Sequence, residues 1–395
     1  MTRHLICCAL IAPLLVFAQE AENPPTLKLD RIPSLPAFAG QTRAPAAPES
    51  AFRIETLAEG LGTPWALAFL PDGEMLVSEY ADGRLRLIDA DGKLSQPISG
   101  LPEISHEGWA GLFDIALDPD FGVNRYLYFS YTAPSGNPDS PNIPRVARAR
   151  FERNDLRLAD VDVLLDGMAW QELHFAPDGH LLVSGTGTDR DANGQDLGSY
   201  SGKLLRLLPD GGIPRDNPWS TDESVPSLIY TYGHRDISGM ATHPDTGEIW
   251  ISEHGARGGD ELNVIRAGAN YGWPVISYGT EYSGAPVGEG GTSSEGMEQP
   301  RYFWRPSIAP SGLMFYTGDL FPEWRGNLFV TALSGQHIAR LVLDGDRVIA
   351  EERLLVANAE RIRELRQGPD GALYALTNEE SDAPKGTGRL LRIYR

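Results

Sequence analysis

Three arginines are the residues of this 395-residue chain whose types and spacing point most clearly to chemistry. Arg235 is followed directly by Asp236, and Arg361 and Arg363 are separated by a single residue near the C-terminus. A guanidinium group presents its donors as a fork that matches carboxylate or phosphate oxygens. If the chain brings these arginines together, they would form a site for a ligand with several negative charges.

Strands joined by a recurring turn must position these side chains. From Ala51 onward, an apolar strand, a Pro-Asp-Gly turn or a near variant, and a second apolar strand return six times. The turn prolines are Pro71, Pro119, Pro177, Pro244, Pro322 and Pro369. Repeats that contain several short strands predict a β-propeller. We therefore predict an all-β fold, a six-bladed β-propeller, because a β-sandwich would not explain a sixfold hairpin.

A propeller closes when its two ends share one blade. Phe52–Leu57 and Arg389–Tyr394 both have strand-like patterns and are predicted to do this. The strand before each turn would be innermost, so residues eight to ten positions before each proline should gather at one mouth of the central channel. The positions at this mouth are Trp109, Met168, Arg235 with Asp236, and Arg361 with Arg363 nearby.

These segments resemble the soluble PQQ-dependent aldose sugar dehydrogenases, also called the glucose/sorbosone dehydrogenase family. The matching motifs include Tyr-Gly-His-Arg-Asp at 232–236, Glu-His-Gly-Ala-Arg-Gly-Gly-Asp-Glu at 253–261 and Arg-Ile-Arg-Glu at 361–364. The match runs from about Gly60 to the C-terminus. The resemblance implies a six-bladed propeller that binds PQQ and Ca²⁺ and oxidises the C1 hydroxyl of an aldose to a lactone by hydride transfer.

The resemblance also assigns residues to the cofactor. It implies that Arg235, Arg361 and Arg363 bind the three carboxylates of PQQ. It implies that backbone carbonyls at Gly255 and Ala256 hold the Ca²⁺ that polarises the quinone.

A second Ca²⁺ is implied nearby, on Asp260, Glu261 and the carbonyl region near Tyr271. Oxygen-rich loops suit a hard cation of this kind. The Gly-Gly-Asp-Glu run taken alone is a weak signal and favours a plain exposed turn over a metal site.

Four positions depart from the family pattern. Met168 replaces the His general base, Trp109 a Gln, Asp236 an Asn and Ser334 a Lys. Because they occupy positions that contact the cofactor in the family, Trp109, Asp236 and Ser334 are still predicted to be cofactor-binding residues. A thioether cannot accept a proton usefully, and general-base catalysis is typically worth about 10²–10⁴-fold.

Two residues are candidates for a replacement base. His106 lies three residues before Trp109, and Asp236 adjoins Arg235, with which it could instead form a simple ion pair. His174 would point into the channel at a level too deep to substitute. The remaining family-matching histidines are interpreted as structural: His234, His243, His254 and His337.

The N-terminal residues predict export. Residues 1–18 combine a basic start at Arg3 with an apolar run and a small-residue end, which is typical of a secretory signal. Residues 19–50 are rich in Pro and Ala and predict a disordered or extended leader before the 51–395 propeller domain. The predicted location is periplasmic or secreted. Cys7 and Cys8 lie in the signal, so the mature chain would have no disulfide.

The net charge of the chain limits the classes of partner that it is expected to bind. A net charge of −20 argues against binding nucleic acid or an anionic membrane, and no membrane span is predicted in the mature chain. Three functions stay open. The first is a PQQ- and Ca²⁺-dependent oxidation of an aldose sugar, with electrons passed to a periplasmic acceptor. The second is a catalytically silent propeller that binds a sugar, an anionic cofactor or a protein, and the third is a metal-dependent lactonase.

Overall fold

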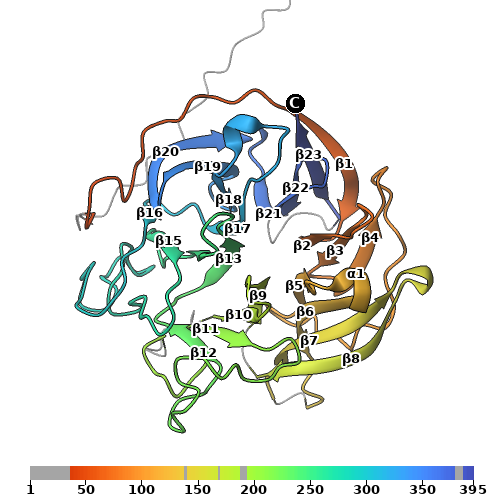
Figure 1. The fold of residues 1–395 in the computed structure, drawn as a ribbon, viewed down its shortest axis with the longest axis horizontal. Coiled ribbons are helices and arrows are strands. Elements are labelled where there is room, and N and C mark those ends of the chain that lie inside the picture. The colour runs from red at the N-terminus through yellow and green to blue at the C-terminus, as the bar shows by residue number, and fades with distance from the viewer. Residues whose placement is uncertain (1–35, 138–139, 168–169, 187–193, 379–385) are drawn as a thin grey trace, which may run out of the picture. The chain divides into compact units, whose positions relative to one another are not determined.

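Six antiparallel sheets are arranged as blades around a common axis (Figure 1). The structure is a computed structural model, and it describes residues 36–137, 140–167, 170–186, 194–378 and 386–395. The arrangement confirms the predicted six-bladed β-propeller.

The first three blades follow one another along the chain. The first contains β2 (Pro64–Phe69), β3 (Met75–Glu79) and β4 (Arg84–Ile88). The second contains β5 (Leu112–Leu117), β6 (Tyr126–Ala133), β7 (Ile143–Glu152) and β8 (Arg157–Asp166). The third contains β9 (Trp170–Phe175), β10 (Leu181–Gly185), β11 (Lys203–Leu207) and β12 (Ile229–Tyr232).

The last three blades complete the ring. The fourth contains β13 (Ile237–Thr242), β14 (Ile249–Glu253), β15 (Asp260–Val264) and β16 (Tyr302–Trp304). The fifth contains β17 (Pro310–Phe315), β18 (Leu328–Ala332), β19 (His337–Asp344) and β20 (Arg347–Leu354). The sixth contains β21 (Arg361–Gln367), β22 (Leu373–Asn378), β23 (Gly388–Tyr394) and β1 (Arg53–Leu61). Short helices lie in the connections: α1 (Phe121–Asn124), η1 (Arg153–Asp155), η3 (Pro322–Trp324) and η4 (Val356–Asn358).

The two ends of the chain close the ring, as predicted. β1 pairs antiparallel with β23, with Arg53 opposite Tyr394 and Ile54 opposite Ile393. The first strand therefore supplies the outer edge of the last blade. Because the closing strands come from opposite ends of the chain, neither end of the propeller leaves an unpaired blade.

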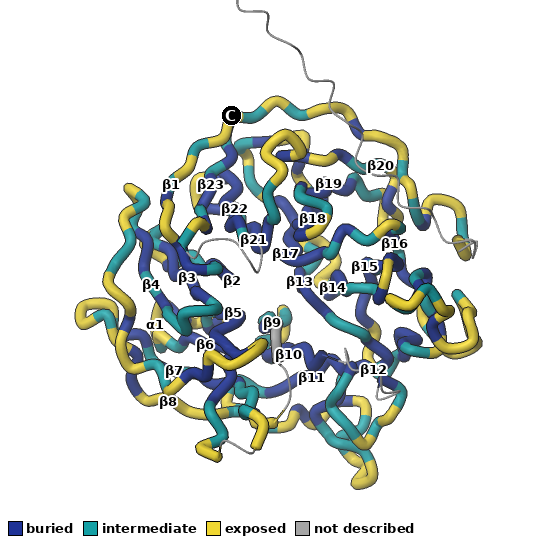
Figure 2. The backbone as a smooth tube through the Cα atoms, turned by 180° about the vertical axis from the view of Figure 1, so that it is seen from behind, coloured by how far each residue is buried: buried dark blue, intermediate teal, exposed yellow. Residues whose placement is uncertain are grey.

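Each blade turns its first strand toward the axis, and the Pro-Asp turn follows at the far end of that strand. The inner strands are β2, β5, β9, β13, β17 and β21, and each contacts the inner strands of the neighbouring blades. They are largely buried (Figure 2). Since all six run in the same direction, their first residues meet at one end of the ring, called the mouth here.

A β-bulge interrupts every inner strand near the mouth. The register shifts occur in all six innermost pairs. Ser78 holds one bulge in place, because its Oγ accepts from the N–H of Ala66 at 3.0 Å and donates to the carbonyl of Phe113 in the next blade at 2.6 Å. A bulge re-aims the side chains that it carries. The bulges thus place polar side chains, among them Asp114 and Glu172, inside the ring.

Residues 36–50 are not disordered. Gln41 is fully buried, its Nε2 donates to the carbonyl of Pro300 at 2.8 Å, and its own carbonyl accepts from the N–H of Phe303. Ser50 donates to Glu352 through both its N–H and its Oγ. Of the two alternatives, disordered or extended, the contacts favour an extended segment here, because its polar groups bond to the fourth and fifth blades. Residues 19–35 lie outside the described residues.

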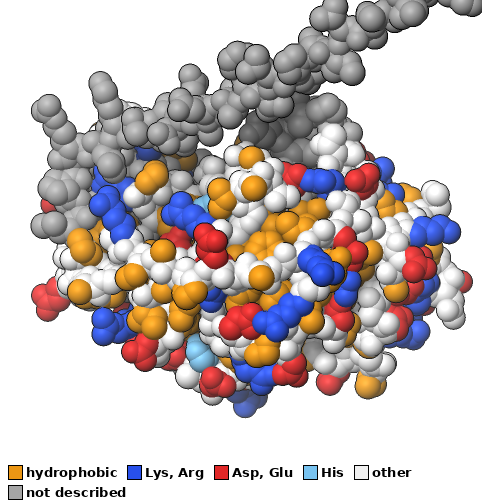
Figure 3. Space-filling view, turned by 90° about the horizontal axis from the view of Figure 1, so that it is seen from above, with side chains coloured by type: hydrophobic (Ala, Val, Ile, Leu, Met, Phe, Trp, Pro, Cys, Tyr) orange, Lys and Arg blue, Asp and Glu red, His pale blue; other side chains and the backbone are white. Residues whose placement is uncertain are grey.

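Acidic and basic side chains are interspersed on the face drawn in Figure 3. None of the helices in the described ranges is long and apolar enough to cross a membrane.

Candidate functional site

Arg235 lies at the mouth, two residues before β13. Its backbone N–H donates to Oε2 of Glu253 at 3.0 Å, and Nη1 donates to the carbonyl of His254 at 3.2 Å. Its guanidinium carbon is 5.4 Å from the centre of the Trp273 ring. Its Nε is buried and has no hydrogen-bond partner. The side chain is thus held at both ends and retains one buried donor for a ligand.

Arg363 lies on β21 and is only 7% exposed. Its guanidinium carbon is 3.2 Å from the centre of the Trp65 ring, which itself packs against Tyr80 and Phe113. Its Nη2 is buried without a partner. A buried guanidinium that stacks on an aromatic ring and lacks a hydrogen bond is prepared for an anionic ligand.

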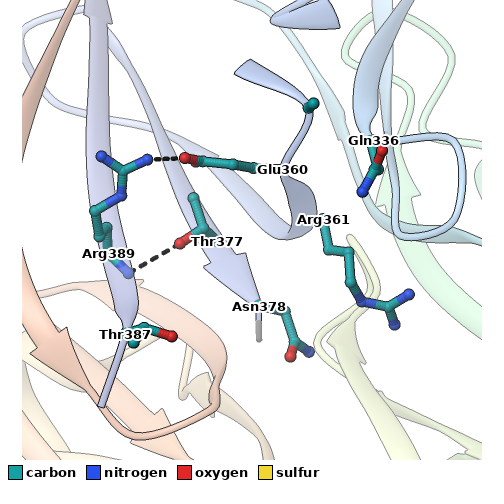
Figure 4. Close-up of a pocket in the computed structure, with 8 residues that line it drawn as sticks. Gln336, Glu360, Arg361, Thr377, Asn378, Thr387 and Arg389 are labelled. Carbon is teal, nitrogen blue, oxygen red and sulfur yellow. Dashed lines mark hydrogen bonds and ion pairs between the residues drawn. The ribbon is translucent and has the colours of Figure 1, made fainter. Parts of the chain in front are cut away.

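Arg361 begins β21 and lines a pocket of about 360 Å³ between the fifth and sixth blades (Figure 4). Its Nε is also buried without a partner. The other lining residues are Gln336, Ala359, Glu360, Thr377, Asn378, Thr387 and Arg389. Glu360 forms an ion pair with Arg389, and the guanidinium group of Arg361 points away from that pair (Figure 4).

Asp236 connects two of the arginines. Burial raises the pKa of its carboxyl, and the positive charges of Arg235 and Arg363 oppose the shift. Arg235 lies two residues before the inner strand β13, and Arg361 and Arg363 lie among the first residues of the inner strand β21. The structure therefore brings the three predicted arginines to the same end of the ring.

The Asp236 carboxyl also faces an imidazole. Nδ1 of His254 is 4.0 Å from Oδ2 of Asp236, and Nε2 of His254 lies 2.5 Å from the carbonyl of Pro310. A carbonyl only accepts, so Nε2 carries the proton and the Nδ1 lone pair faces the carboxyl. Oδ1 of Asp236 is buried with no hydrogen-bond partner. His254, expected to be only structural, therefore lies beside the better placed of the two candidate bases.

The other mouth residues predicted from sequence are more exposed. His106 is exposed, and its Nδ1 donates to the carbonyl of Ala81 at 3.1 Å, which leaves Nε2 free to accept a proton. Trp109, three residues further on, is 87% exposed. Ser334 is exposed in the turn between β18 and β19. Met168, the family's base position, lies outside the described residues.

His174 is half-buried on β9, the inner strand of the third blade. Its Nε2 lies 2.8 Å from the hydroxyl of Thr242, and burial lowers the imidazole pKa to about 4. The ring is therefore neutral at physiological pH. Its position on β9 beyond Glu172 keeps it away from the mouth.

The loop after β14 supplies unpaired carbonyls beside Arg235. The carbonyl oxygens of Gly255 and Ala256 accept no hydrogen bond from any described residue. Ala256 is 5% exposed and packs with Trp273, the ring over which Arg235 lies. Buried carbonyls without donors suit a hard cation such as Ca²⁺.

Asp260 and Glu261 do not face one site, because neighbouring residues of a strand point to opposite faces. Oδ1 of Asp260 accepts from the N–H of Gly255 at 3.0 Å. Its Oδ2 accepts from the hydroxyl of Ser307 and from the N–H groups of Ile308 and Ala309, at 2.7–3.0 Å. The Asp260 carboxylate is thus saturated with donors and holds the 305–309 loop, a structural role in place of the metal-binding one expected from the motif.

Glu261 instead faces Glu253 across the β14–β15 pair. Nδ2 of Asn263 lies between them, 2.9 Å from Oε1 of Glu253 and 3.1 Å from Oε2 of Glu261. Burial and the neighbouring Glu253 carboxyl raise the pKa of Glu261 well above its ordinary range. Two facing carboxyls in a buried place retain a proton or bind a cation. The hydroxyl of Tyr271 donates to the carbonyl of Val264 and accepts from the N–H of Arg266, whereas its backbone carbonyl, the group implied for the metal, accepts no hydrogen bond from a described residue.

Sequence reasoning missed Glu253 and the acids of the bulges. Glu253 and Glu261 bracket a single hairpin loop, so the strand register could have paired them. Asp114, Glu172 and Glu364 each stand five residues before a turn proline, and that shared spacing was the available signal.

Comparison with known proteins gives consistent matches over nearly the whole chain. A family model described as Glucose / Sorbosone dehydrogenase matches residues 61–392. Aldose sugar dehydrogenase YliI of Escherichia coli is 36% identical over 349 residues, which cover 86% of this chain and 92% of that protein. Quinoprotein glucose dehydrogenase B of Acinetobacter calcoaceticus is 27% identical over 443 residues, covering 90% and 92%.

Two solved structures are similar as well. The soluble aldose sugar dehydrogenase from Escherichia coli in the apo-form has a TM-score of 0.81 and 37% identity, covering 87% of this chain and 99% of that one. The PQQ-bound form of the aldose sugar dehydrogenase from Streptomyces coelicolor has a TM-score of 0.71 and 28% identity, covering 88% and 99%.

Proposed function

The chain belongs to the glucose/sorbosone dehydrogenase family, and from this membership we propose that it binds PQQ and Ca²⁺ at the mouth and oxidises aldose sugars at C1. The observation that carries the proposal is the set of three arginines at one end of the ring. Each of them keeps a buried guanidinium nitrogen that has no hydrogen-bond partner among the described residues.

The residues at the mouth fit PQQ. Its three carboxylates match the three guanidinium groups of Arg235, Arg361 and Arg363 in number and charge. Trp273 and Trp65 hold two of these groups in place by stacking. When bound, PQQ supplies the electrophilic quinone that takes up the hydride from C1 of the sugar.

The proposed calcium ligands follow from the free acceptors. The carbonyls of Gly255 and Ala256 would hold the ion next to the cofactor. A second ion would take Glu261 with Glu253, because the Asp260 carboxylate already accepts one hydrogen bond at Oδ1 and three at Oδ2. This second ion would relieve the repulsion between the Glu253 and Glu261 carboxyls, which favours a retained proton when no cation is bound.

Asp236 is the proposed general base. Its Oδ1 is buried and unpaired, and it lies among the arginines that would hold the cofactor. In the reaction it would accept the proton of the C1 hydroxyl, while the Nδ1 lone pair of His254 favours the protonated carboxyl that results. His106 is the weaker candidate because it is exposed and bonded to a loop carbonyl rather than to a mouth residue.

A silent propeller is the second candidate. The substitutions at Met168, Trp109 and Ser334 favour it, because each replaces a polar group that the family resemblance implies for cofactor or substrate. In that case the mouth would bind an anionic cofactor without turnover. A lactonase is supported less, since the site is rich in guanidinium groups and not in metal-binding carboxylates.

Export completes the proposal. The signal-like residues 1–18 would place the enzyme in the periplasm or outside the cell, where a periplasmic electron acceptor would reoxidise the cofactor. The sugar itself would be an aldose with a free C1 hydroxyl.

The test is to add PQQ and Ca²⁺ to the purified protein and follow both PQQ absorbance and dye reduction by aldoses. Saturable binding with aldose-dependent dye reduction is expected. Saturable binding without dye reduction would select the silent propeller. Absence of PQQ binding would overturn both cofactor-based proposals.

A further inference from the structure

A cluster of charged side chains lies inside the ring below the mouth, and most of it has no part in the proposed reaction. The six inner strands surround the axis (Figure 1). Three of them, β2, β13 and β17, contain no titratable side chain. The other three contribute the groups that are called the interior cluster here: Asp114 on β5, Glu172 on β9, and Arg363, Glu364 and Arg366 on β21. Because burial keeps the imidazole of His174 on β9 neutral, the cluster consists of three carboxyls and two guanidinium groups.

Two of the three carboxyls accept hydrogen bonds that stabilise their ionised forms. Oδ1 of Asp114 accepts from the N–H of Ile115 at 2.8 Å, and Oδ2 accepts from the N–H of Leu173 in the next blade at 2.7 Å. Oε1 of Glu364 accepts from the N–H of the following residue at 2.7 Å and from Nη1 of Arg366 at 2.8 Å. Donors that face a carboxylate favour its charged form. Asp114 and Glu364 are therefore the acids of the cluster that ionise first.

Glu172 lacks such donors. Its side chain is only 7% exposed, and its carboxyl accepts no hydrogen bond from a described residue. Burial and the neighbouring Asp114 carboxyl raise the pKa of Glu172 well above its ordinary range. Glu364 adds to the shift, and Arg363 and Arg366 oppose it. Glu172 is therefore the carboxyl of the cluster that retains its proton to the highest pH.

The strands that pack against β9 from the second and third blades leave this proton to the interior cluster. β10 contains no titratable side chain. The tyrosines of β6 are uncharged near neutral pH; they are Tyr126, Tyr128 and Tyr131. The charged residues of β7 all pair within the second blade: Arg145 with Asp166, Arg148 with Asp162, Arg150 with Asp160, and Glu152 with Arg157.

Arg363 is the member of the cluster that also serves the mouth. Of the acids that act electrostatically on its guanidinium group, Glu172 has the largest effect. Trp65 holds this guanidinium by stacking, and Nη2 is buried with no partner among the described residues. The charge of Arg363 is therefore shared between Glu172 and any anion that binds the free nitrogen.

The charges of the interior cluster favour one retained proton. With its three carboxyls ionised beside two guanidinium groups, the cluster has a net charge of −1, and a single proton makes it neutral. A buried charge is costly unless it is compensated. An anion on Arg363 adds a further negative charge, which strengthens the binding of the proton.

We propose that Glu172 is a positioning residue for Arg363: its protonated form leaves the guanidinium group to an anionic ligand at the mouth, and its ionised form competes with that ligand. The inference rests on the proposed function for the identity of the ligand, PQQ. Glu172 itself touches neither the cofactor nor the substrate in this role. It acts through the charge of Arg363.

The pH dependence of PQQ binding tests this role. PQQ is titrated into the full chain by its absorbance, with Ca²⁺ at saturation, from pH 6 to pH 10. The carboxylates of PQQ stay ionised throughout this range. Wild-type affinity should fall about tenfold as Glu172 ionises, because the complex binds the proton more tightly than the free protein does.

Glu172→Gln imitates the protonated carboxyl. At pH 6 this variant should match the wild-type affinity within about twofold, because the amide is neutral and of the same size. It should lack the fall at higher pH. Glu172→Asp retains a carboxyl and should retain the fall. A purely structural role for Glu172 predicts instead a loss of affinity at every pH.

Two further variants assign the proton to one residue. Glu364→Gln should keep the fall at high pH. Glu59→Gln is the matched control, since Glu59 is exposed on the outer strand β1. The inference is overturned by a wild-type affinity that does not change with pH, or by a fall that persists in Glu172→Gln and disappears in Glu364→Gln.

Infrared spectra of the Ca²⁺-loaded protein without PQQ separate this inference from the proposed function. Above the pKa of Glu364, about 7, the carbonyl stretch of protonated carboxyls should be weaker in Glu172→Gln by one group. Failure of PQQ to bind would refute the proposed function, and this band would then decide whether Glu172 holds the proton. An equal band in the two proteins would overturn the inference. Melting curves show whether each variant is folded.

Discussion

The guanidinium carbon of Arg363 lies 3.2 Å from the centre of the Trp65 indole, and one of its terminal nitrogens is buried without a hydrogen-bond partner. A buried cation is costly unless it is compensated. The indole face offsets part of that cost, and the acids Asp236, Asp114, Glu172 and Glu364 act on the same group electrostatically. The free nitrogen is what remains for a ligand.

Replacing Arg363 with Met should therefore weaken PQQ binding by at least about tenfold, because a hydrogen bond to a charged group contributes about 1.5–3 kcal/mol. Titration of PQQ absorbance measures the change. Arg266→Met is the control, since Arg266 pairs with Glu248 in an outer part of the fourth blade. Equal PQQ affinities in the two variants would show that Arg363 does not bind the cofactor.

Asp236→Asn should lower the rate of dye reduction by about 10²–10⁴-fold while PQQ binding persists, because the amide cannot take the proton. His106→Ala should leave most of the rate. The wild-type rate should rise with pH through the pKa of Asp236, which burial holds above its ordinary value, since only the ionised carboxylate is a base. A large loss in His106→Ala and none in Asp236→Asn would reverse the assignment.

The ring was predictable because its signals are local. Each hairpin combines alternating apolar residues with a Pro-Asp turn, and the same unit returns six times. The strap formed by residues 36–50 was not predictable in this way, because its bonds join distant positions: Gln41 and Pro300 are 259 residues apart. Proline-rich composition describes an extended chain but not the surface that receives it.

The candidate site was predictable in part. Arg235, Arg361 and Arg363 stand nine, eight and six residues before their turn prolines, toward the start of the inner strand in each case, so their convergence followed from the repeat. Asp260 was assigned to the metal site because it is adjacent to Glu261 in the Gly-Gly-Asp-Glu motif. In a β-strand, however, adjacent side chains point to opposite faces. The donors that occupy Asp260 come from the 305–309 loop, more than forty residues away.

The split between Asp260 and Glu261 predicts opposite responses to calcium. Asp260→Ala should destabilise the fold by roughly 2–4 kcal/mol, because it leaves several buried donors unsatisfied, and chelator should not change that loss. Glu261→Gln should instead abolish the stabilisation that Ca²⁺ gives to the wild type. Thermal melts with Ca²⁺ and with EDTA provide the comparison. A Ca²⁺-dependent defect in Asp260→Ala would return that residue to the metal site.

The strap should contribute to the stability of the fourth and fifth blades. Gln41→Ala removes a fully buried amide whose oxygen and nitrogen bond to Ala37, Tyr278 and Pro300. A loss of about 2–3 kcal/mol is expected from the cavity and from the unpaired groups. Urea unfolding measures it, with Ser135→Ala on an exposed loop as the control. A loss no larger than that of the control would show that the strap is dispensable.

Titration of the Glu364 carboxyl should make the free energy of unfolding decrease as the pH rises. Burial raises its pKa to about 7, Asp114 adds to the shift, and Arg366 and Arg363 oppose it. The folded state therefore binds the proton more tightly than the unfolded chain. The resulting stabilisation is complete below the unfolded pKa, near 4.5, and disappears as pH passes about 7.

Glu364→Gln removes this titration but keeps the size of the side chain. Urea unfolding between pH 5 and pH 8 should show the wild type losing roughly 1–3 kcal/mol relative to the variant. The substitution also alters the hydrogen bond that Arg366 donates to Glu364, which changes the absolute stability of the variant. The prediction therefore concerns how the free energy of unfolding changes with pH, and not its absolute value. Parallel curves for the two proteins would mean that Glu364 is already ionised across this range, held so by the two arginines.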